Sequence, residues 1–316
     1  MAERIIFLRV IKTIVGLLGI FGNALVCLVI YKIKSMHTTT NAFIFNQAAI
    51  DFLGSTMLLL SSNIPTPSPV PDNLAGGFLC RLWISNFFLW SFLTASTLNL
   101  VSLTFERYVA IVFPFKHGTI YGEVPVRVLI AAAWIIGTAS SFYDIAFYDV
   151  VDGTCQSISV PGSEAVGVMI FLLQYLIPVC AMLVAYIHII VVLKQSASRV
   201  APPPARTQAM GSSSVEAADA SLLRARRNTF KTLLIVFITY VVCWTLNSII
   251  FFMFNFGYPL DFNGALYIIS VALVAINSCA NPVIYAVKYR QFRRGLRQLL
   301  GLPVINEDVS TSGSGA

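Results

Sequence analysis

The residues of this chain best suited to chemistry are an isolated acid, Asp51, and an adjacent charged pair, Glu106-Arg107, because they lie within or at the edge of long apolar runs. Ionisable groups in such surroundings are costly and therefore usually functional. A buried carboxylate binds a cation or is kept protonated as a structural group. A buried ion pair is stable while both partners are present, and losing one partner is expensive. These residues mark a candidate cation site and a charged pair that needs a functional explanation.

Other polar side chains accompany Asp51 inside the apolar runs. They are Asn23, Ser96, Asn99, Asn247, Asn277, Ser278 and Asn281. They must face one another or water, because facing lipid would leave their hydrogen-bonding groups without partners. The cluster favours a water-filled pocket that binds a cation at Asp51. The alternative is a protonated carboxyl that holds the helices together.

The composition places these residues in a membrane. Of 316 residues, 57% are hydrophobic and 11% are charged, and the mean hydropathy is +0.79, so polar residues are too few to coat a soluble protein of this size. Seven runs are long enough to span a bilayer as helices: residues 7–33, 42–62, 80–112, 126–148, 165–193, 231–256 and 262–287. Barrel strands would be shorter and would alternate in polarity. We therefore predict an all-α membrane protein, a seven-helix bundle.

The remaining segments complete the predicted organisation. We expect a short extracellular N-terminus at 1–6, the helical domain at 7–300 and a disordered cytoplasmic tail at 301–316. Residues 289–300 place apolar side chains on one helical face and arginines on the other, which predicts an amphipathic eighth helix on the inner leaflet. Residues 61–72 are rich in proline and predicted to be extended. Residues 195–220 are predicted to be a disordered linker.

The loop charges orient the bundle. With the N-terminus outside, 17 of the 21 Lys and Arg residues fall in or beside the cytoplasmic loops and tail, the exceptions being Arg4, Arg9, Lys12 and Arg81. This asymmetry predicts a multi-pass protein of the plasma membrane, with membrane lipid as a partner of its basic inner surface. The basic residues do not form a long block interleaved with aromatics, so nucleic acid is not an expected partner.

Two cysteines lie on the predicted outer side: Cys80 at the start of the third run, and Cys155 in the loop after the fourth. The oxidising exterior permits a disulfide. We predict that they pair and hold the loop 149–163 over the mouth of the bundle. The other four cysteines lie within apolar runs and are interpreted as small buried side chains.

Six motifs follow one another along the runs. They are Asn46-Gln-Ala-Ala-Ile-Asp51, Glu106-Arg107-Tyr108, Trp134, Pro178 with Tyr186, Cys243-Trp244 and Asn281-Pro282-Val-Ile-Tyr285. Together with the cysteine pair, this order resembles the rhodopsin-like (class A) family of G-protein-coupled receptors from about residue 7 to 300. The resemblance implies a receptor, not an enzyme. It implies an extracellular ligand, a heterotrimeric G protein, a receptor kinase and arrestin as partners.

The resemblance also assigns roles to residues. The G-protein coupling switch comprises Glu106, Arg107, Tyr108, Tyr186, Asn281, Pro282 and Tyr285. In the family the acid holds the arginine at rest, and the arginine contacts the G protein once the sixth helix has swung outward. A bound sodium ion is implied at Asp51. Its pocket is formed by Asp51, Ser96, Trp244, Asn277, Ser278 and Asn281.

Three departures from the family pattern bear on activation and ligand binding. Leu246 stands where the sixth helix usually has a proline, and Arg226 stands where an acid often pairs across with the arginine. The second departure predicts a weaker resting lock and some basal signalling. Cys80 is two residues further from Arg107 than usual, which shifts the register of the ligand-facing end.

The ligand vestibule is predicted from the upper parts of the helices. Its candidate residues are Trp83, Leu89, Trp90, Gln174, Trp244, Asn247, Phe251 and Tyr267. Amine receptors carry an Asp where this chain has Leu89, and opsins carry a Lys where it has Ala275. An amine bound by that route and retinal are therefore not expected. A peptide is favoured, followed by a small neutral or lipid-like molecule.

A non-signalling transporter or channel is the alternative function. A transporter would show paired inverted halves with broken helices, and a channel would show repeated charges or carbonyl-lined loops. The seven runs show neither pattern. For an enzyme the sequence offers no HExxH or GxSxG motif. His37, His117 and His188 lie near the predicted cytoplasmic ends without a carboxylate cluster, so we interpret them as interfacial residues.

Overall fold

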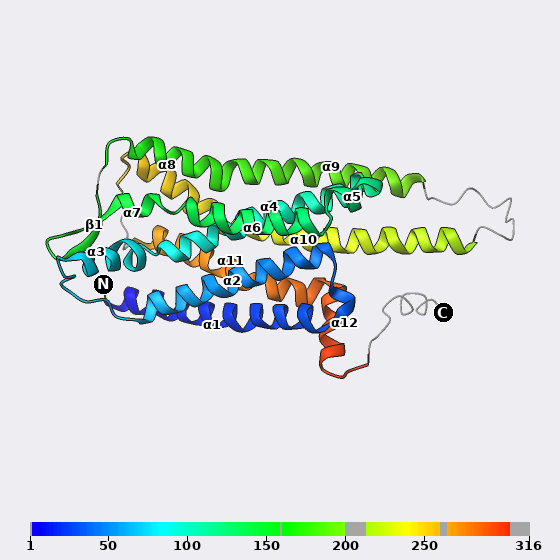
Figure 1. Ribbon diagram of the computed structural model, residues 1–316, viewed down its shortest axis with the longest axis horizontal. Coiled ribbons are helices and arrows are strands. Elements are labelled where there is room, and N and C mark those ends of the chain that lie inside the picture. The colour runs from blue at the N-terminus through cyan, green and yellow to red at the C-terminus, as the bar shows by residue number, and fades with distance from the viewer. Residues whose placement is uncertain (1, 159, 200–212, 260–263, 304–316) are drawn as a thin grey trace.

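The computed structural model describes residues 2–158, 160–199, 213–259 and 264–303. Its long helices lie side by side along one axis (Figure 1). They are α1 (Ala2–Lys32), α2 (Thr39–Asn63), α4 (Phe87–Val112), α6 (Glu123–Ala139), α9 (Ile177–Arg199), α10 (Ser213–Asn255) and α11 (Ala265–Lys288). The shorter elements are η1 (Lys34–Met36), α3 (Leu74–Phe78), η2 (Leu79–Ile84), α5 (Pro114–Ile120), α7 (Tyr143–Phe147), β1 (Tyr148–Val151), β2 (Thr154–Ser157), α8 (Ser163–Phe171), η3 (Leu172–Leu176) and α12 (Arg290–Leu299).

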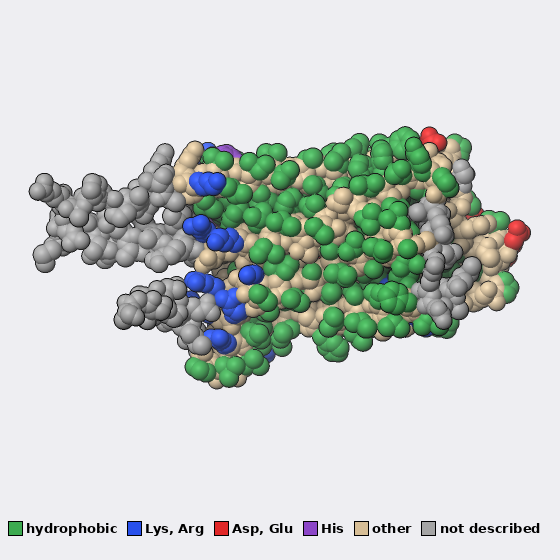
Figure 2. Space-filling model, turned by 180° about the vertical axis from the view of Figure 1, so that it is seen from behind, with side chains coloured by type: hydrophobic (Ala, Val, Ile, Leu, Met, Phe, Trp, Pro, Cys, Tyr) green, Lys and Arg blue, Asp and Glu red, His purple; other side chains and the backbone are tan. Residues whose placement is uncertain are grey.

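The exterior of the bundle is suited to lipid. Within the described residues, six helical segments are long and apolar enough to cross a membrane, and α6 gives a seventh span when taken with α5, from which it is bent by 68°. Figure 2 shows hydrophobic side chains covering the length of one face, with Lys and Arg gathered at one end. Such a surface is unfavourable in water. The predicted all-α seven-helix fold is confirmed.

Helix α4 is the central element, because it packs against α2, α6, α9 and α10. Its contact with α6 is close. A Cβ atom on Gly137 of α6 would lie 2.7 Å from the backbone nitrogen of Ala95 on α4, so only glycine fits at this crossing. The crossing lies one helical turn from Trp134, whose side chain therefore reaches into the bundle.

The helix bounds depart from the predicted spans in three places. The fourth span ends at Ala139 instead of 148, because the Ser140 and Ser141 hydroxyls turn back to the carbonyl of Gly137. The third span is interrupted before α4 by Asn86, which has a left-handed backbone with φ of 63°. Both ends of the predicted linker 195–220 are helical, because α9 continues to Arg199 and α10 begins at Ser213. Helix formers such as Glu216, Ala217, Ala218 and Leu222 follow that start.

The other predicted segments agree with the structure in part. Helix α1 begins at Ala2, so the predicted N-terminal segment 1–6 is helical from its second residue, whereas α12 forms within the predicted 289–300. Residues 64–72 form neither helix nor strand, as expected, although α2 extends to Asn63. Part of the linker, 200–212, and the tail from 304 onward lie outside the described residues.

One end of the bundle, which we call the hairpin end, is covered by β1 and β2. These strands pair antiparallel with Val150 opposite Cys155. The Cys80–Cys155 disulfide, confirmed here, attaches the hairpin to η2. Arg81 reinforces the attachment by donating to the Asp149 carboxylate at 3.0 Å and to the Tyr148 carbonyl at 3.1 Å. The opposite end, which carries α12 (Figure 1), is called the α12 end.

Candidate functional site

A cavity of about 230 Å³ extends from the hairpin end into the bundle. It brings together six of the eight predicted vestibule residues: Trp90, Gln174, Trp244, Asn247, Phe251 and Tyr267. The other two lie elsewhere. Trp83 belongs to η2, and Leu89, which neighbours Trp90 on α4, is turned into the hydrophobic core. Consecutive helical residues point about 100° apart, so one of such a pair lines a cavity while the other packs.

The cavity wall is aromatic and polar but uncharged. None of the described side chains that line it is ionisable as an acid or base near neutral pH. Its hydrogen-bonding groups include Gln174, Ser248 and Asn255. Asn255 has room because Gly167 faces it: a Cβ on Gly167 would lie 2.1 Å from the Asn255 Oδ1. The wall is therefore suited to an uncharged group with apolar surface and a few hydrogen bonds.

The sequence missed several of these wall residues. Tyr143, Phe147 and Tyr148 come from the segment predicted to end the fourth helix, and they reach the cavity because the chain turns at Ser140. Gly167 and Asn255 carried a weak signal, since each is an exception within an apolar run. Their pairing across α8 and α10 depends on tertiary packing.

The floor of the cavity is Trp244, whose side chain is almost fully buried. No described residue accepts a hydrogen bond from its Nε1. The ring packs on Tyr240 with centroids 5.8 Å apart. The Tyr240 hydroxyl donates to the Gln174 carbonyl at 3.3 Å and accepts from Thr97 at 3.2 Å. A ligand that touches Trp244 on α10 would therefore act, through Tyr240, on Thr97 of α4 and Gln174 of η3.

Below the floor lies a buried network around Asp51, which is 2% exposed. Asn281 donates to its carboxylate at 2.8 Å and Ser96 at 3.1 Å, so two of the predicted partners do meet it. Asn277 and Ser278 are buried nearby, but no described hydrogen bond joins either side chain to Asp51. The Ser278 carbonyl instead accepts from Asn23 at 2.8 Å.

Gln47 is the member of this network that sequence reasoning missed. Its Nε2 lies 3.3 Å from each carboxylate oxygen of Asp51 and also donates to Ser96. The sequence spacing could have indicated this contact, because residues four apart on a helix share a face. Gln47 and Asp51 have that spacing on α2.

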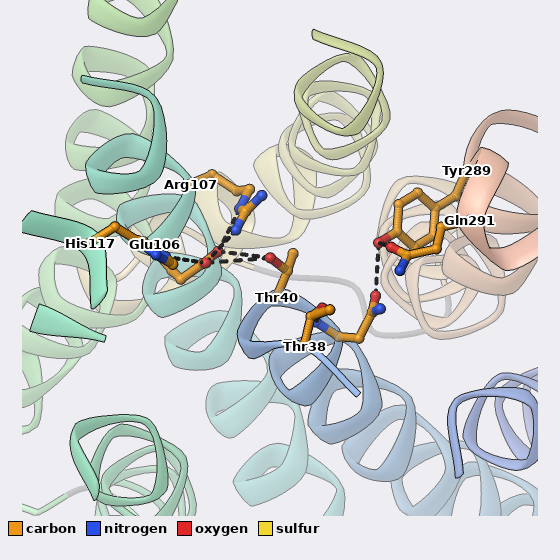
Figure 3. A network of polar contacts seen from close by, with 8 residues as sticks. Thr38, Thr40, Glu106, Arg107, His117, Tyr289 and Gln291 are labelled. Atoms are coloured by element: carbon orange, nitrogen blue, oxygen red, sulfur yellow. Dashed lines mark hydrogen bonds and ion pairs between the residues drawn. The ribbon is translucent and has the colours of Figure 1, made fainter. Parts of the chain in front are cut away.

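At the α12 end, Glu106 is fully buried and forms the centre of a charged cluster (Figure 3). Arg107 makes two hydrogen bonds to its carboxylate, one of them from Nε at 2.5 Å. The Thr40 hydroxyl donates to the same group at 3.3 Å. The predicted acid–arginine pair is therefore present, and in this conformation the arginine is held by its neighbour on α4.

The interpretation of His117 as an interfacial residue is wrong. Helix α5 places the Nε2 of His117 2.8 Å from the Glu106 carboxylate. Tyr121 stacks on the imidazole with centroids 5.8 Å apart. Burial, assisted by the charge of Glu106, raises the pKa of Tyr121 to about 12, so this phenol stays neutral. His188 also has a partner, the Tyr108 hydroxyl at 3.0 Å.

The two other switch tyrosines are not joined to each other. The Tyr186 hydroxyl donates to the Leu233 carbonyl of α10 at 3.1 Å, and the ring packs against Phe230 and Phe237. Tyr285, in α11 after Pro282, is 1% exposed, and its hydroxyl has no partner among the described residues. Tyr186 thus holds α10 close to α9 in this conformation.

Comparison with known proteins gives one family. The family model described as 7 transmembrane receptor (rhodopsin family) matches residues 22–285. Galanin receptor 2b of Danio rerio is 25% identical over 305 residues, which cover 93% of this chain and 75% of the relative. Somatostatin receptor type 5 of Rattus norvegicus is 27% identical, with coverage of 96% and 80%. Trace amine-associated receptor 9 of Rattus norvegicus is 29% identical, with coverage of 93% and 87%.

Proposed function

Because the chain belongs to the rhodopsin (class A) family of G-protein-coupled receptors, which are non-enzymatic and signal in response to an extracellular ligand, we propose the finer assignments that follow. The receptor lies in the plasma membrane with the hairpin end outside. Its ligand enters the cavity above Trp244. Signalling proceeds by outward movement of α10, which frees Arg107 to contact a heterotrimeric G protein. A receptor kinase and arrestin act on the same cytoplasmic surface.

The distribution of charge supports this orientation. Lys and Arg gather at the α12 end, where the cytoplasmic loops are placed, and acidic residues appear at the hairpin end (Figure 2). Basic residues favour the cytoplasmic side of a membrane protein. The disulfide at the hairpin end agrees with an oxidising exterior.

The observation that carries the proposed mechanism is the buried Glu106–Arg107 pair together with the Tyr186 contact to α10. The pair withholds the guanidinium from any partner, and the Tyr186 hydroxyl restrains the helix whose movement would open this end. Both restraints belong to one conformation. Displacing α10 breaks the Leu233 contact and opens the surface in front of Arg107. A two-state switch requires contacts that hold one conformation and are broken in the other. The Glu106–Arg107 pair and the Tyr186–Leu233 hydrogen bond are contacts of that kind.

For the ligand we propose a peptide that inserts an uncharged segment. The absence of charge among the described wall residues supports this class over an amine, which would need a counter-ion inside the cavity. Receptors for galanin, somatostatin and allatostatin-A are among the curated relatives. Trace amine-associated receptors are also among the relatives, so an amine is the ligand class that competes with a peptide. A small neutral or lipid-like molecule would also suit the wall chemistry.

The test is receptor-stimulated nucleotide exchange. The purified full chain in nanodiscs should accelerate exchange on at least one Gα subunit, either unaided or with a peptide library. Arg107→Ala should abolish the acceleration, whereas Arg127→Ala should not, because Arg127 belongs to an exposed pair with Glu123. Solute flux through the chain with no response from any Gα subunit would favour a transporter or channel and overturn the proposal.

A further inference from the structure

The carboxylate of Asp51 is surrounded by neutral hydrogen-bond donors from three helices. Gln47 lies on α2, Ser96 on α4 and Asn281 on α11, and each donates to a carboxylate oxygen. Gln47 also donates to the Ser96 oxygen. The Ser96 hydroxyl therefore accepts from one neighbour and donates to the other.

The direction of the Gln47 amide is fixed from outside the site. Trp134 is the starting point because an indole N–H is only a donor. It donates to the Asn46 Oδ1 at 2.9 Å, which leaves the Asn46 amide nitrogen to donate to the Asn99 Oδ1 at 2.8 Å. The Asn99 nitrogen then donates to the Gln47 Oε1 at 2.8 Å. The Gln47 nitrogen is left facing Asp51.

A second contact fixes the same direction independently. The Asn99 nitrogen also donates to the backbone carbonyl of Phe43 at 3.0 Å. A carbonyl only accepts, so the Asn99 amide cannot be reversed. Amide orientations are assigned from such networks. Here, two groups with a single possible role, one donor and one acceptor, determine the orientation of all three amides between Trp134 and Asp51.

This arrangement does not fit the sodium ion that the family resemblance implies. A hard cation takes oxygen ligands. Beside the Asp51 carboxylate, the amide hydrogens of Gln47 and Asn281 point toward the oxygens that a cation would need. Of the other oxygens predicted as ligands, that of Ser96 already accepts a hydrogen bond from the Gln47 amide. A cation would have to displace the Gln47 amide and reverse the chain of donors behind it.

We propose that the Gln47 side-chain amide takes the place of sodium beside Asp51, so that the resting conformation of this receptor is independent of sodium. The amide nitrogen supplies the positive end of a dipole where a cation would supply a charge. Because the amide is covalently part of α2, the contacts that join α2, α4 and α11 at Asp51 are made at any ion concentration.

The experiment measures the melting temperature of the full chain in sodium chloride and in N-methyl-D-glucamine chloride at equal ionic strength. The wild type should melt at the same temperature in both salts. Gln47→Ala should melt lower in the glucamine salt and gain about 2–4 °C, saturably, in sodium. Asp51→Asn in the Gln47→Ala background should remove that gain. The measurement needs no G protein and no ligand. A negative result would therefore overturn this proposal without bearing on the proposed signalling function.

Two further variants test the specificity of the effect. Asn41→Ala removes another buried amide of α2, one that bonds Met36 and Tyr289, and should lower the melting temperature equally in both salts. Trp134→Phe leaves every atom beside Asp51 in place, and the Phe43 carbonyl still fixes the direction of the Asn99 amide, so this variant should remain insensitive to sodium. A wild type that sodium stabilises, or a Gln47→Ala variant that gains nothing from sodium, overturns the proposal.

Discussion

Glu106 is the residue on which the α12 end depends. Its carboxylate is fully buried and receives hydrogen bonds from Arg107, Thr40 and His117. A buried carboxylate is tolerated only when its charge is paired and its oxygens have donors. The cluster therefore stabilises the conformation in which Arg107 is turned toward its neighbour. At the position where the family often has an acid that also pairs with this arginine, the sequence has Arg226. That position therefore offers Arg107 no second carboxylate.

Removing the charge of Glu106 should shift this receptor toward its active conformation. Glu106→Gln keeps the size and hydrogen-bonding capacity of the side chain but leaves Arg107 without its counter-charge. We expect ligand-independent nucleotide exchange on a responsive Gα subunit to rise about tenfold, which corresponds to a shift of about 1.4 kcal/mol in the resting equilibrium. Glu123→Gln breaks the exposed pair with Arg127 and should leave the rate unchanged. Equal basal rates in the two variants would contradict this role.

At the residue scale, the sequence predicts the buried ionisable groups but not all of their partners. Asp51, Glu106 and Arg107 stand out because they interrupt apolar runs. The contact of His117 with Glu106 depends on α5 folding back against α4, which hydropathy does not encode. Gln47 shares a face with Asp51, yet its role follows from the amide chain that begins at Trp134 on α6. Such a chain can be traced only after the helices are packed.

At the scale of elements, α6 is the least obvious span because it has only 17 residues. Its place depends on the close crossing with α4 at Gly137. Hydropathy predicted the spans well, since each apolar run contains a helix. Hydropathy did not predict where the helices end, because local hydrogen bonds and backbone conformation determine those positions. The Ser140 and Ser141 hydroxyls end the fourth span, and the left-handed Asn86 separates η2 from α4.

Adding one methyl group at the α4–α6 crossing should measure its importance. In Gly137→Ala the new Cβ would lie 2.7 Å from the backbone of Ala95, so the helices must separate. Overpacking of this kind costs about 1–3 kcal/mol, and we expect the melting temperature to fall by about 2–10 °C. Gly118→Ala is the matched control, because nothing lies within 4 Å of its added Cβ. It should melt at or slightly above the wild-type temperature. Equal melting temperatures for the two variants would show that α6 does not depend on this crossing.

Over the whole molecule, the functional groups lie at three levels along the bundle: the cavity above Trp244, the network at Asp51 and the cluster at Glu106. Helix α4 contributes to each level through Trp90, Ser96 and Glu106. The order of the motifs along the sequence predicted these levels. The ligand-facing level was predicted least completely, because its wall includes side chains from the hairpin and α7 whose positions follow from turns and from the disulfide.

The disulfide should act on stability and on the cavity, but not on the cluster at the other end. Cys80→Ala with Cys155→Ala opens a loop with a sequence separation of 75. The chain-entropy model gives a loss of about 4.5 kcal/mol, which is an upper limit because the membrane already restrains the unfolded chain. We expect a melting temperature lower by up to about 10 °C. Basal nucleotide exchange, measured below that temperature, should stay within about twofold of wild type, since distant sites that share no partners are nearly independent. Cys180 is a free thiol that is exposed, contrary to the burial expected from its apolar run, so Cys180→Ala should change neither quantity. If the folded double variant instead lost or greatly increased basal exchange, the hairpin would be a restraint on the resting state. The three levels would then have to be treated as one coupled unit.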